Sequence, residues 1–569
     1  MYYPQDVEED MGPTMLLPGR LRRLYTPPQT AKLGWIRGQE KVVVKAGTLA
    51  VCYPSILHAR AAHFSDKQRS MIKYGFEVAD PQYGYYLTEA AYQNFRRTEL
   101  GCSLTKHAEV KDREDALWNS YWKFHGSYTF QDYKHQIGVV GRALRKHLDH
   151  EAANSGKLPM TTYATQLFLN PQAQEVKEYG PAQQDLLNQE AFADVKGEIT
   201  HWPDYAPTPL MAFNNLASAA SVGALWCKHE GFRFGIGSFK PTGPTYAMLA
   251  VLKNEVQKAT GVDVVTTQDL VERKYETITR DIVVSATTSG NHGRALAWGA
   301  RTFGCRCIVY MNDGVSAGRE RAIAAYGAEV IRVPGAYDQA VQRSYRDAEA
   351  LGYFVISDYV SATYPHVPRA IMQGYAFVAD EIVEQLAGQE PPTHVFAPGG
   401  GGRLSAAVCG QLWQRYGQHR PRVIVTEPTA SCCLYESAQA GRPITVSGET
   451  KSVMDGLVVE EASAEAWTIL GAGAFAFLTV PDQAAVDAMQ QAAQPRGNDP
   501  PAVIGDTGSA GWAGFLAASS DPQLSQQLGL DHRSRVVIVV TEGATDPQVY
   551  RDIVGKSPDE VLAGKSNTL

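Results

Sequence analysis

The feature that most constrains the fold is a rhythm that begins at about residue 196, in which short apolar runs alternate with amphipathic stretches. The apolar runs are DIVVSA, CRCIVYM, AEVIRVP, THVFAP, PRVIVTEP and SRVVIVVTEG. Runs that are apolar almost throughout are typical of strands covered on both faces, and the stretches between them, such as AIMQGYAFVADEIVEQL, have helical spacing. The sequence therefore predicts an α/β protein built on a parallel sheet.

The first 195 residues lack this rhythm and are rich in Tyr, Trp and His. One segment, QIGVVGRALRKHLDH at 136–150, places apolar residues on one helical face, and an aromatic cluster lies at 117–133. Packing or a contact between subunits explains such a cluster more simply than a binding surface does. We expect residues 1–195 to form an N-terminal extension or accessory domain, and no catalytic motif lies in it.

Composition excludes several classes of function. An apolar share of 44% and a charged share of 20% are typical of a folded protein. The net charge of −7, without a basic run that contains aromatic residues, predicts no nucleic-acid partner. The start, MYYPQDVEEDMGPTM, lacks the basic and apolar regions of a secretory signal, and no apolar run has the length of a membrane span. We therefore expect a cytoplasmic protein with no membrane partner.

Eight cysteines are few for a chain of 569 residues. Two close pairs, Cys305 with Cys307 and Cys432 with Cys433, lack the two-residue gap of zinc and thioredoxin-type motifs. We expect reduced, mostly buried thiols and no metal site.

A lysine without charged neighbours on its C-terminal side, Lys240, follows the segment GSF and precedes PTGPT. Pro241 suits the first turn of a helix, where its missing N–H costs nothing, and TYAMLAVLKNEVQKA continues with helical spacing. Lys240 is therefore expected where an extended segment enters a helix. Taken alone, the pattern is explained more simply by a surface lysine beside a turn.

Ligands of parallel α/β proteins gather at the carboxyl ends of strands, and three strand ends here carry unusual residues. After DIVVSA, a polar turn of Ser289, Gly290, Asn291 and His292 is expected to lead into a helix that starts near Arg294. Such a turn can direct N–H and side-chain groups at a carboxylate or a phenolic oxygen. A plain connection between strand and helix is the alternative.

Four consecutive glycines, Gly399, Gly400, Gly401 and Gly402, separate THVFAP from the helical RLSAAVCGQLWQRYG. They cost backbone entropy, which favours a ligand that approaches the main chain closely, such as a phosphate at a helix N-terminus. The Gly-Lys-Ser/Thr ending of a P-loop and the spaced glycines of a dinucleotide site are both missing. At the end of SRVVIVV, the hydroxyl of Thr541 could hold a ring nitrogen, although from spacing alone a capping threonine is the better explanation.

These features together describe a site for pyridoxal 5′-phosphate. Lys240 would form the Schiff base, the four glycines would hold the phosphate, Asn291 would meet the ring oxygen O3′, and Thr541 would meet the pyridine nitrogen.

Residues 203–553 resemble the fold-type II pyridoxal-phosphate enzymes of the tryptophan synthase β superfamily, and within it the diaminopropionate ammonia-lyase family. The stretches that carry the resemblance are YAPTPL, RFGIGSFK, TSGNHGRALAWGAR, YGAEVIRV, IMQGYAFVADE, MDGLVV, GNDPPAVIGDTGSAG and TEGATDP. The resemblance implies two twisted, mostly parallel sheets flanked by helices. It implies a large cofactor-binding domain at 196–280 and 366–569, and a small domain at 281–365, after the N-terminal region 1–195.

The resemblance also implies roles for individual residues. For the cofactor, it adds Phe239 as the residue that packs against the ring. For the substrate, it implies that Thr288, Ser289, Gly290 and Asn291 form the loop that binds the carboxylate and O3′. Asp358, in ISDYV, falls where the ammonia-lyases have an aspartate near the distal amine of the substrate. The catalytic residues would be Lys240, Ser289 and Asp358.

The implied activity is α,β-elimination from a small, diaminopropionate-like amino acid, through an aminoacrylate, to a 2-oxo acid and ammonia. Ser289 replaces the aspartate of the ammonia-lyases and resembles serine racemase, so use of a D-substrate is open. The tetraglycine, Pro244, Asp506 and the N-terminal region also depart from the ammonia-lyase pattern. Alternatives are a β-replacement synthase that makes a nonstandard amino acid, a racemase, and a non-catalytic cofactor-binding protein that acts through its N-terminal region. We expect a homodimer that acts on a small amino acid.

Overall fold

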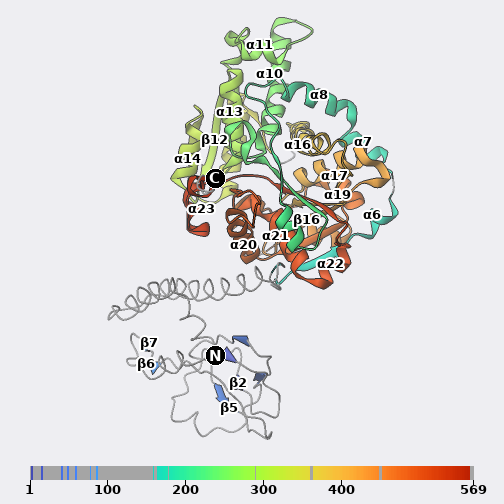
Figure 1. Cartoon of the computed structure of the whole chain (residues 1–569). Helices are drawn as coiled ribbons and strands as arrows, with labels where there is room; N and C mark the ends of the chain where they lie inside the picture. The colour runs from blue at the N-terminus through green and yellow to red at the C-terminus, as the bar shows by residue number, and fades with distance from the viewer. Residues whose placement is uncertain are drawn as a thin grey trace. The chain divides into compact units, whose positions relative to one another are not determined.

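The computed structural model describes residue 158, residues 163–176, 178–288, 290–358, 363–447 and 451–563, and seven short strands before residue 87. The chain divides into two compact units, residues 1–146 and residues 147–569 (Figure 1). In the first unit the described strands pair antiparallel, β1 with β4, β2 with β3 and β5, and β6 with β7. They are β1 (Tyr2–Tyr3), β2 (Thr14–Leu16), β3 (Glu40–Val42), β4 (Thr48–Leu49), β5 (His58–Arg60), β6 (Glu77–Val78) and β7 (Tyr85–Tyr86). The helix expected at 136–150 and the aromatic cluster at 117–133 lie outside the described residues.

The second unit contains a seven-stranded sheet in the order β8-β17-β16-β15-β18-β10-β9. Its strands are β8 (Gln166–Leu169), β9 (Leu210–Ala212), β10 (Ala224–His229), β15 (His394–Pro398), β16 (Arg422–Pro428), β17 (Ala476–Val480) and β18 (Arg535–Val540). The five inner strands run parallel, and only the edge strands β8 and β9 pair antiparallel. A second sheet, wholly parallel, has the order β13-β12-β11-β14. Its strands are β11 (Val283–Thr287), β12 (Arg306–Asn312), β13 (Glu329–Val333) and β14 (Phe354–Val355).

Successive residues of the inner strands enter two different hydrophobic clusters, as the period-2 geometry of a strand requires. In β18, Val537 and Val539 belong to one cluster, whereas Val536 and Ile538 belong to the other. The first cluster includes side chains of α10, α16, α17 and α19, and the second includes side chains of α20 and α21. The seven-stranded sheet is therefore covered on both faces, which explains why most residues of its inner strands are apolar.

The helices are α6 (Pro171–Glu175), α7 (Pro181–Leu186), α8 (Gln189–Ile199), α9 (Asn214–Ala219), η1 (Glu230–Gly235), η2 (Lys240–Thr242), α10 (Pro244–Thr260), α11 (Thr267–Val271), α12 (Glu276–Thr279), α13 (Asn291–Phe303), α14 (Ala317–Ala324), α15 (Tyr337–Leu351), α16 (Val367–Gln385), α17 (Arg403–Tyr416), η3 (Gly417–His419), α18 (Cys433–Ala440), η4 (Asp455–Leu457), α19 (Ala464–Gly473), α20 (Asp482–Ala493), η5 (Thr507–Ser509), α21 (Ala510–Ser520), α22 (Pro522–Leu528), α23 (Pro547–Val554) and α24 (Pro558–Ala563). No described helix has both the length and the apolar composition needed to traverse a bilayer. All six cysteines of the described chain are free thiols, and five of them are buried.

A buried network of charges joins α16 to the chain that leads toward Lys240. Glu381 of α16 binds Lys228 of β10, with 2.5 Å between Oε2 and Nζ, and Arg233 of η1, with 2.7 Å between Oε1 and Nη1. Arg233 also pairs with Glu230 at 2.8 Å. All four side chains are at most 3% exposed, so each charge depends on the others. The network therefore fixes α16 against the end of β10.

The structure confirms the α/β class, the two mostly parallel sheets and the six strands expected from the apolar runs. Two helix starts differ from expectation. A short turn, η2, comes between Lys240 and α10, and α13 begins at Asn291 rather than near Arg294. The domain limits stay a prediction; the seven-stranded sheet takes β8 from before residue 195, and that limit falls within α8.

Candidate active site

Lys240 lies at the start of η2, and backbone hydrogen bonds tie the residues before it to the end of β18. The N–H of Phe239 donates to the carbonyl of Thr541 at 3.0 Å, and the N–H of Gly543 donates to the carbonyl of Gly237 at 2.9 Å. Gly237 has a φ of +88°, a conformation that glycine adopts readily. These bonds set Lys240 beside Thr541, although the two residues are distant in the sequence.

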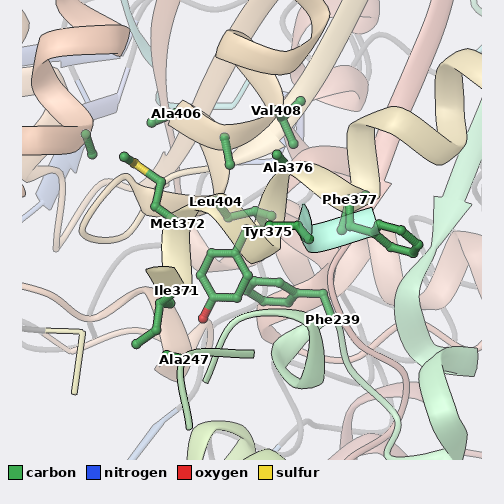
Figure 2. Packing of buried hydrophobic residues seen from close by; sticks show 14 of the residues in the cluster. Phe239, Ala247, Ile371, Met372, Tyr375, Ala376, Phe377, Leu404, Ala406 and Val408 are labelled. Atoms are coloured by element: carbon green, nitrogen blue, oxygen red, sulfur yellow. The ribbon is translucent and has the colours of Figure 1, made fainter. Parts of the chain in front are cut away.

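The amino group of Lys240 contacts two polar side chains and two aromatic rings. Its Nζ atom lies 3.2 Å from Oδ2 of Asp358 and 3.0 Å from the hydroxyl oxygen of Tyr375. It also lies 5.2 Å and 5.3 Å from the ring centroids of Phe239 and Tyr375. Those two rings pack together with their centroids 4.7 Å apart (Figure 2). The side chain of Lys240 is 22% exposed, so a small part of it can be reached by a ligand and the rest is enclosed by neighbouring residues.

The contacts favour an ammonium and a carboxylate. Burial by itself would lower the pKa of Lys240, but the charge of Asp358 and the contact with Tyr375 outweigh it and raise that pKa. Burial would raise the pKa of Asp358, but Lys240 and then His292 outweigh it and lower that pKa strongly. The pKa of Tyr375 is raised, first by burial and then by the charge of Asp358. Around neutral pH the site therefore holds a charged lysine, a charged aspartate and a neutral phenol.

Asp358 is fixed in place while one of its oxygens stays free. Nδ1 of His292 lies 3.3 Å from Oδ2 of Asp358, and Nε2 of His292 lies 2.7 Å from the carbonyl oxygen of Ile356. Arg403, the first residue of α17, donates from Nε to the backbone carbonyl of Asp358 at 2.8 Å. Oδ1 of Asp358 is buried and has no hydrogen-bond partner among the described residues. A buried, unpartnered carboxylate oxygen is suited to a cationic group of a ligand.

The polar turn after β11 leads directly into α13. The N–H of Gly290 donates to the hydroxyl of Thr288 at 3.1 Å, and the N–H of Thr288 donates to the carbonyl of Tyr310 at 3.2 Å. Asn291 is the first residue of α13, and its side-chain amide donates to Glu542. Ser289 lies outside the described residues. The first turn of α13 and its free N–H groups therefore begin where β11 ends.

Glu542, which follows Thr541, is an acidic residue of the site to which the sequence analysis gave no role. Burial, and then the charge of Asp506, raise its pKa well above the ordinary value. Both effects favour the protonated, neutral form of this carboxyl. Glu542 connects Asn291 to the end of β18 through the hydrogen bond from the Asn291 amide.

The hydroxyl of Thr541 tests whether the residues fit pyridoxal phosphate. Thr541 is 2% exposed, and its buried hydroxyl finds no hydrogen-bond partner in the described part of the chain. Burying a hydroxyl in this way costs free energy unless a ligand supplies the partner. A ring nitrogen is such a partner, so Thr541 fits the pyridine end of the cofactor.

The tetraglycine tests the other end of the cofactor. Gly400 and Gly402 have φ angles of +67° and +94°, which other residues rarely adopt. A β-carbon at Gly399 would come within 2.3 Å of Cγ of Glu427. Within the described chain, the N–H groups of Gly400, Gly401 and Gly402 find no acceptor. Free N–H groups just before α17 form a cradle that fits a phosphate.

Glu427 lies directly behind this cradle and is fully buried. It accepts hydrogen bonds from the N–H groups of Leu434 at 3.1 Å and Tyr435 at 2.8 Å. Burial raises the pKa of Glu427 to about 8, although those two hydrogen bonds act in the opposite direction. The carboxyl is therefore largely protonated at neutral pH, which limits the negative charge behind a bound phosphate.

The structure brings the described candidates together in two connected groups. Phe239, Lys240, Asp358 and Thr541 are linked by the contacts above, and Arg403 ties Asp358 to the end of the tetraglycine. Thr288, Gly290 and Asn291 reach the same place through Glu542. Their individual roles stay predictions. Four residues were missed or left without a role: Tyr375, His292, Arg403 and Glu542. Only His292 had a signal in the sequence, its place in the polar turn.

Comparisons with known proteins agree with this reading. The family described as "Pyridoxal-phosphate dependent enzyme" matches residues 201–542. Diaminopropionate ammonia-lyase of Salmonella typhimurium is 33% identical over 391 residues, which are 66% of this chain and 95% of that protein. The Escherichia coli K12 enzyme of the same name is 34% identical over 354 residues, which are 62% of this chain and 87% of that protein.

Solved structures of the Escherichia coli diaminopropionate ammonia-lyase are similar to this chain. The holo form has a TM-score of 0.63 and 30% identity, and the match covers 69% of this chain and 97% of that one. The same enzyme in complex with an aminoacrylate-PLP azomethine reaction intermediate has a TM-score of 0.60. The resemblance and the cofactor predicted from the sequence are confirmed. The chain belongs to the fold-type II pyridoxal-phosphate dependent enzymes, and its cofactor is pyridoxal 5′-phosphate.

Proposed function

We propose that the protein is a lyase that eliminates the β-substituent of a small amino acid, with diaminopropionate as the first candidate substrate. The observation that carries the proposal is the pair formed by Lys240 and Asp358, in which one carboxylate oxygen is buried and unpartnered. That oxygen would accept a hydrogen bond from a cationic distal amine. The similarity to diaminopropionate ammonia-lyases supports the same assignment.

The chemistry divides between the cofactor and the chain. Pyridoxal phosphate, when bound, withdraws electrons from the Cα atom of an amino acid and so acidifies its Cα–H bond. Nζ of Lys240, as the neutral amine that the amino acid has displaced from the cofactor, accepts that proton, and the bond between Cβ and its substituent breaks with the electron pair leaving on the substituent. Water then completes the reaction, which gives a 2-oxo acid and ammonia. Thr541 offers a neutral hydroxyl to the ring nitrogen, so it places no carboxylate charge there.

The remaining candidate residues would bind and orient the substrate and the cofactor. Thr288, Gly290 and the first turn of α13 would hold the substrate carboxylate, and Asn291 would hold the ring oxygen of the cofactor. The N–H groups of residues 400–402 would hold the phosphate, and Phe239 would pack against the ring. Ser289 would serve the face of Cα opposite Lys240, where a hydroxyl is a weaker base than a carboxylate. Turnover of L-substrates is therefore expected to exceed that of D-substrates.

The test is to incubate the full chain with a panel of β-substituted amino acids and to measure 2-oxo acid and ammonia. We expect diaminopropionate to give both products without an added nucleophile. We also expect Lys240→Ala to lose the visible absorbance of lysine-bound pyridoxal phosphate. A Lys240→Ala protein that kept this absorbance would refute the role of Lys240.

A second candidate function is β-replacement, in which an added nucleophile takes the place of the leaving group. It is favoured by the first unit, residues 1–146, because the solved ammonia-lyase matches only 69% of this chain while 97% of its own length is covered. Product that forms only when a nucleophile such as a thiol or an amine is present would establish replacement instead of elimination.

The assembly and the location proposed are a cytoplasmic homodimer, as expected from the sequence. Light scattering of the full chain tests the dimer, and fractionation of cells that produce the protein tests the location.

A further inference from the structure

Tyr375 is the second hydrogen-bond partner of the reacting nitrogen, and nothing in the sequence pattern assigns it a role. It lies in α16, is 1% exposed, and its hydroxyl oxygen is 3.0 Å from Nζ of Lys240. Among the described residues, this hydroxyl makes no other hydrogen bond. A buried phenol with a single polar partner depends on that partner for its hydrogen bonding.

Two glycines allow the tyrosine ring to lie directly against the lysine turn. A β-carbon at Gly243 would come within 2.3 Å of Cε1 of Tyr375, and one at Gly374 would come within 1.9 Å of the carbonyl oxygen of Thr242. No other residue fits at either position without a shift of α16 or η2. The close approach of helix and turn is therefore a requirement of the fold, and it sets the hydroxyl at Nζ.

Packing alone does not explain the hydroxyl. The ring of Tyr375 packs against that of Phe239 in the apolar cluster seen in Figure 2, and a phenylalanine would make the same contact. What the hydroxyl adds is one polar contact, and that contact is with the reacting nitrogen. The hydroxyl oxygen of Tyr375 therefore contributes a contact with Lys240 and adds nothing to the packing of the hydrophobic core.

We propose that Tyr375 is a catalytic residue of this site, whose hydroxyl, together with Asp358, holds the amino group of Lys240 whenever that nitrogen is not bonded to the cofactor. The proposal rests on the function proposed above. A phenol accepts a hydrogen bond from an ammonium and donates one to a neutral amine, whereas the carboxylate of Asp358 only accepts. Tyr375 can therefore keep Lys240 in place both before and after it takes a proton.

The other charged groups nearby, His292 and Arg403, make their contacts with Asp358 and none with the hydroxyl of Tyr375, although the charge of Arg403 also opposes the burial that raises the pKa of Tyr375. His292 faces Oδ2 of Asp358, and Arg403 binds the backbone carbonyl of the same residue. Both remain in place when only the tyrosine hydroxyl is removed. A Tyr375→Phe variant therefore isolates the contact between the phenol and Nζ.

The first measurement is the pKa of Lys240 in the full chain freed of cofactor, obtained from competitive chemical labelling across pH with mass spectrometric readout. A hydrogen bond to a charged group is lost in Tyr375→Phe, so we expect the pKa of Lys240 to fall by about one unit. The matched control is Tyr550→Phe. Tyr550 lies in the hydrophobic cluster on the opposite face of the sheet, and its equally buried hydroxyl has no hydrogen-bond partner among the described residues. The control is expected to leave the Lys240 pKa unchanged.

The second measurement uses the holoenzyme and L-alanine, which has no β-leaving group. Spectral titration reports how readily this amino acid displaces Lys240 from the cofactor. Because the freed lysine loses a partner in Tyr375→Phe, we expect about tenfold more L-alanine to be needed for half-displacement.

Unchanged labelling and unchanged displacement in Tyr375→Phe would overturn the proposal, and so would equal effects in Tyr550→Phe. If Tyr375→Phe fails to fold, Tyr375→Met fills the slot with a flexible side chain and is judged by the same two measurements. Failure of the proposed function is distinguishable from these outcomes. It would appear as no 2-oxo acid and no ammonia from diaminopropionate, whereas the labelling experiment needs neither substrate nor cofactor.

Discussion

Gly374 of α16 lies against the carbonyl oxygen of Thr242, so close that a β-carbon on the glycine would come within 1.9 Å of that oxygen. We expect Gly374→Ala to lower the free energy of unfolding by about 1–3 kcal/mol, the usual cost of overpacking, because α16 must move away from the lysine turn. Chemical denaturation measures the change. The control is Gly197→Ala in α8, where a β-carbon meets no atom within 4 Å and a gain of about 0.5–1 kcal/mol is expected. A Gly374→Ala protein as stable as the parent would contradict the packing described here.

The hydroxyl of Thr541 is expected to lower the free energy of unfolding of the cofactor-free protein and to strengthen cofactor binding. Replacing it with valine removes a buried hydroxyl that has no partner, so the cofactor-free protein should unfold with a free energy up to about 1 kcal/mol higher. The same change should weaken binding of pyridoxal phosphate about tenfold. Thr541→Ser keeps the hydroxyl and is the control for binding. Equal affinity of the valine and serine variants would argue against a contact with the ring nitrogen.

Asp358→Asn removes the negative charge beside Lys240 while keeping the shape of the side chain. Two results are expected: the pKa of Lys240 falls, because the charge that raised it is gone, and discrimination between substrates falls. The ratio of kcat/KM for diaminopropionate to that for serine, whose distal group is uncharged, should drop about tenfold or more. If Asp358→Asn lowered kcat/KM for both substrates in equal proportion, Asp358 would not recognise the distal amine.

Glu427 is expected to make stability fall as pH rises. Its ordinary pKa is about 4.3, and burial raises the folded-state pKa to about 8. Between these values the folded protein binds more protons than the unfolded chain, so the contribution of Glu427 to the free energy of unfolding decreases with pH and levels off above about 8. Glu427→Gln cannot ionise, so its free energy of unfolding should rise relative to that of the parent protein as the pH increases across this window. Denaturation curves at several pH values would show the two proteins converging or crossing; parallel profiles would mean that Glu427 is already charged.

Six strands of the second unit could be predicted because their burial is reflected in their own residues, whereas β8, β9, β10, β14 and β17 were not predicted. After an initial arginine, β12 is buried over CIVYM and β18 is buried over VVIVV. Lys240, Asn291 and Thr541 could be singled out for a similar reason, since each stands at the end of an element. Features that depend on a residue and its neighbours in the sequence could therefore be predicted from the sequence alone.

Tyr375 and Glu542 could not be assigned in this way. Tyr375 reads as one more buried residue of α16, and only the packing of that helix on η2 brings its hydroxyl to Nζ. Glu542 resembles an ordinary turn residue in the sequence, and its raised pKa depends on burial and on the charge of Asp506, both of which come from the tertiary structure. The start of α13 was placed too late because Gly290 and Asn291 look like loop residues, whereas Gly290 caps the helix.

The position of β18 has a consequence for the way this chain is made. It is the last of the described strands in sequence, yet it lies between β15 and β10 in the sheet. On the ribosome, Lys240 and the glycine cradle therefore leave the exit tunnel well before the strand that joins their two halves of the sheet exists. A nascent or truncated chain that ends before residue 535 carries the lysine but lacks Thr541 and Glu542. Capture of the cofactor thus belongs to the final stage of synthesis, and premature termination gives a chain without a complete site.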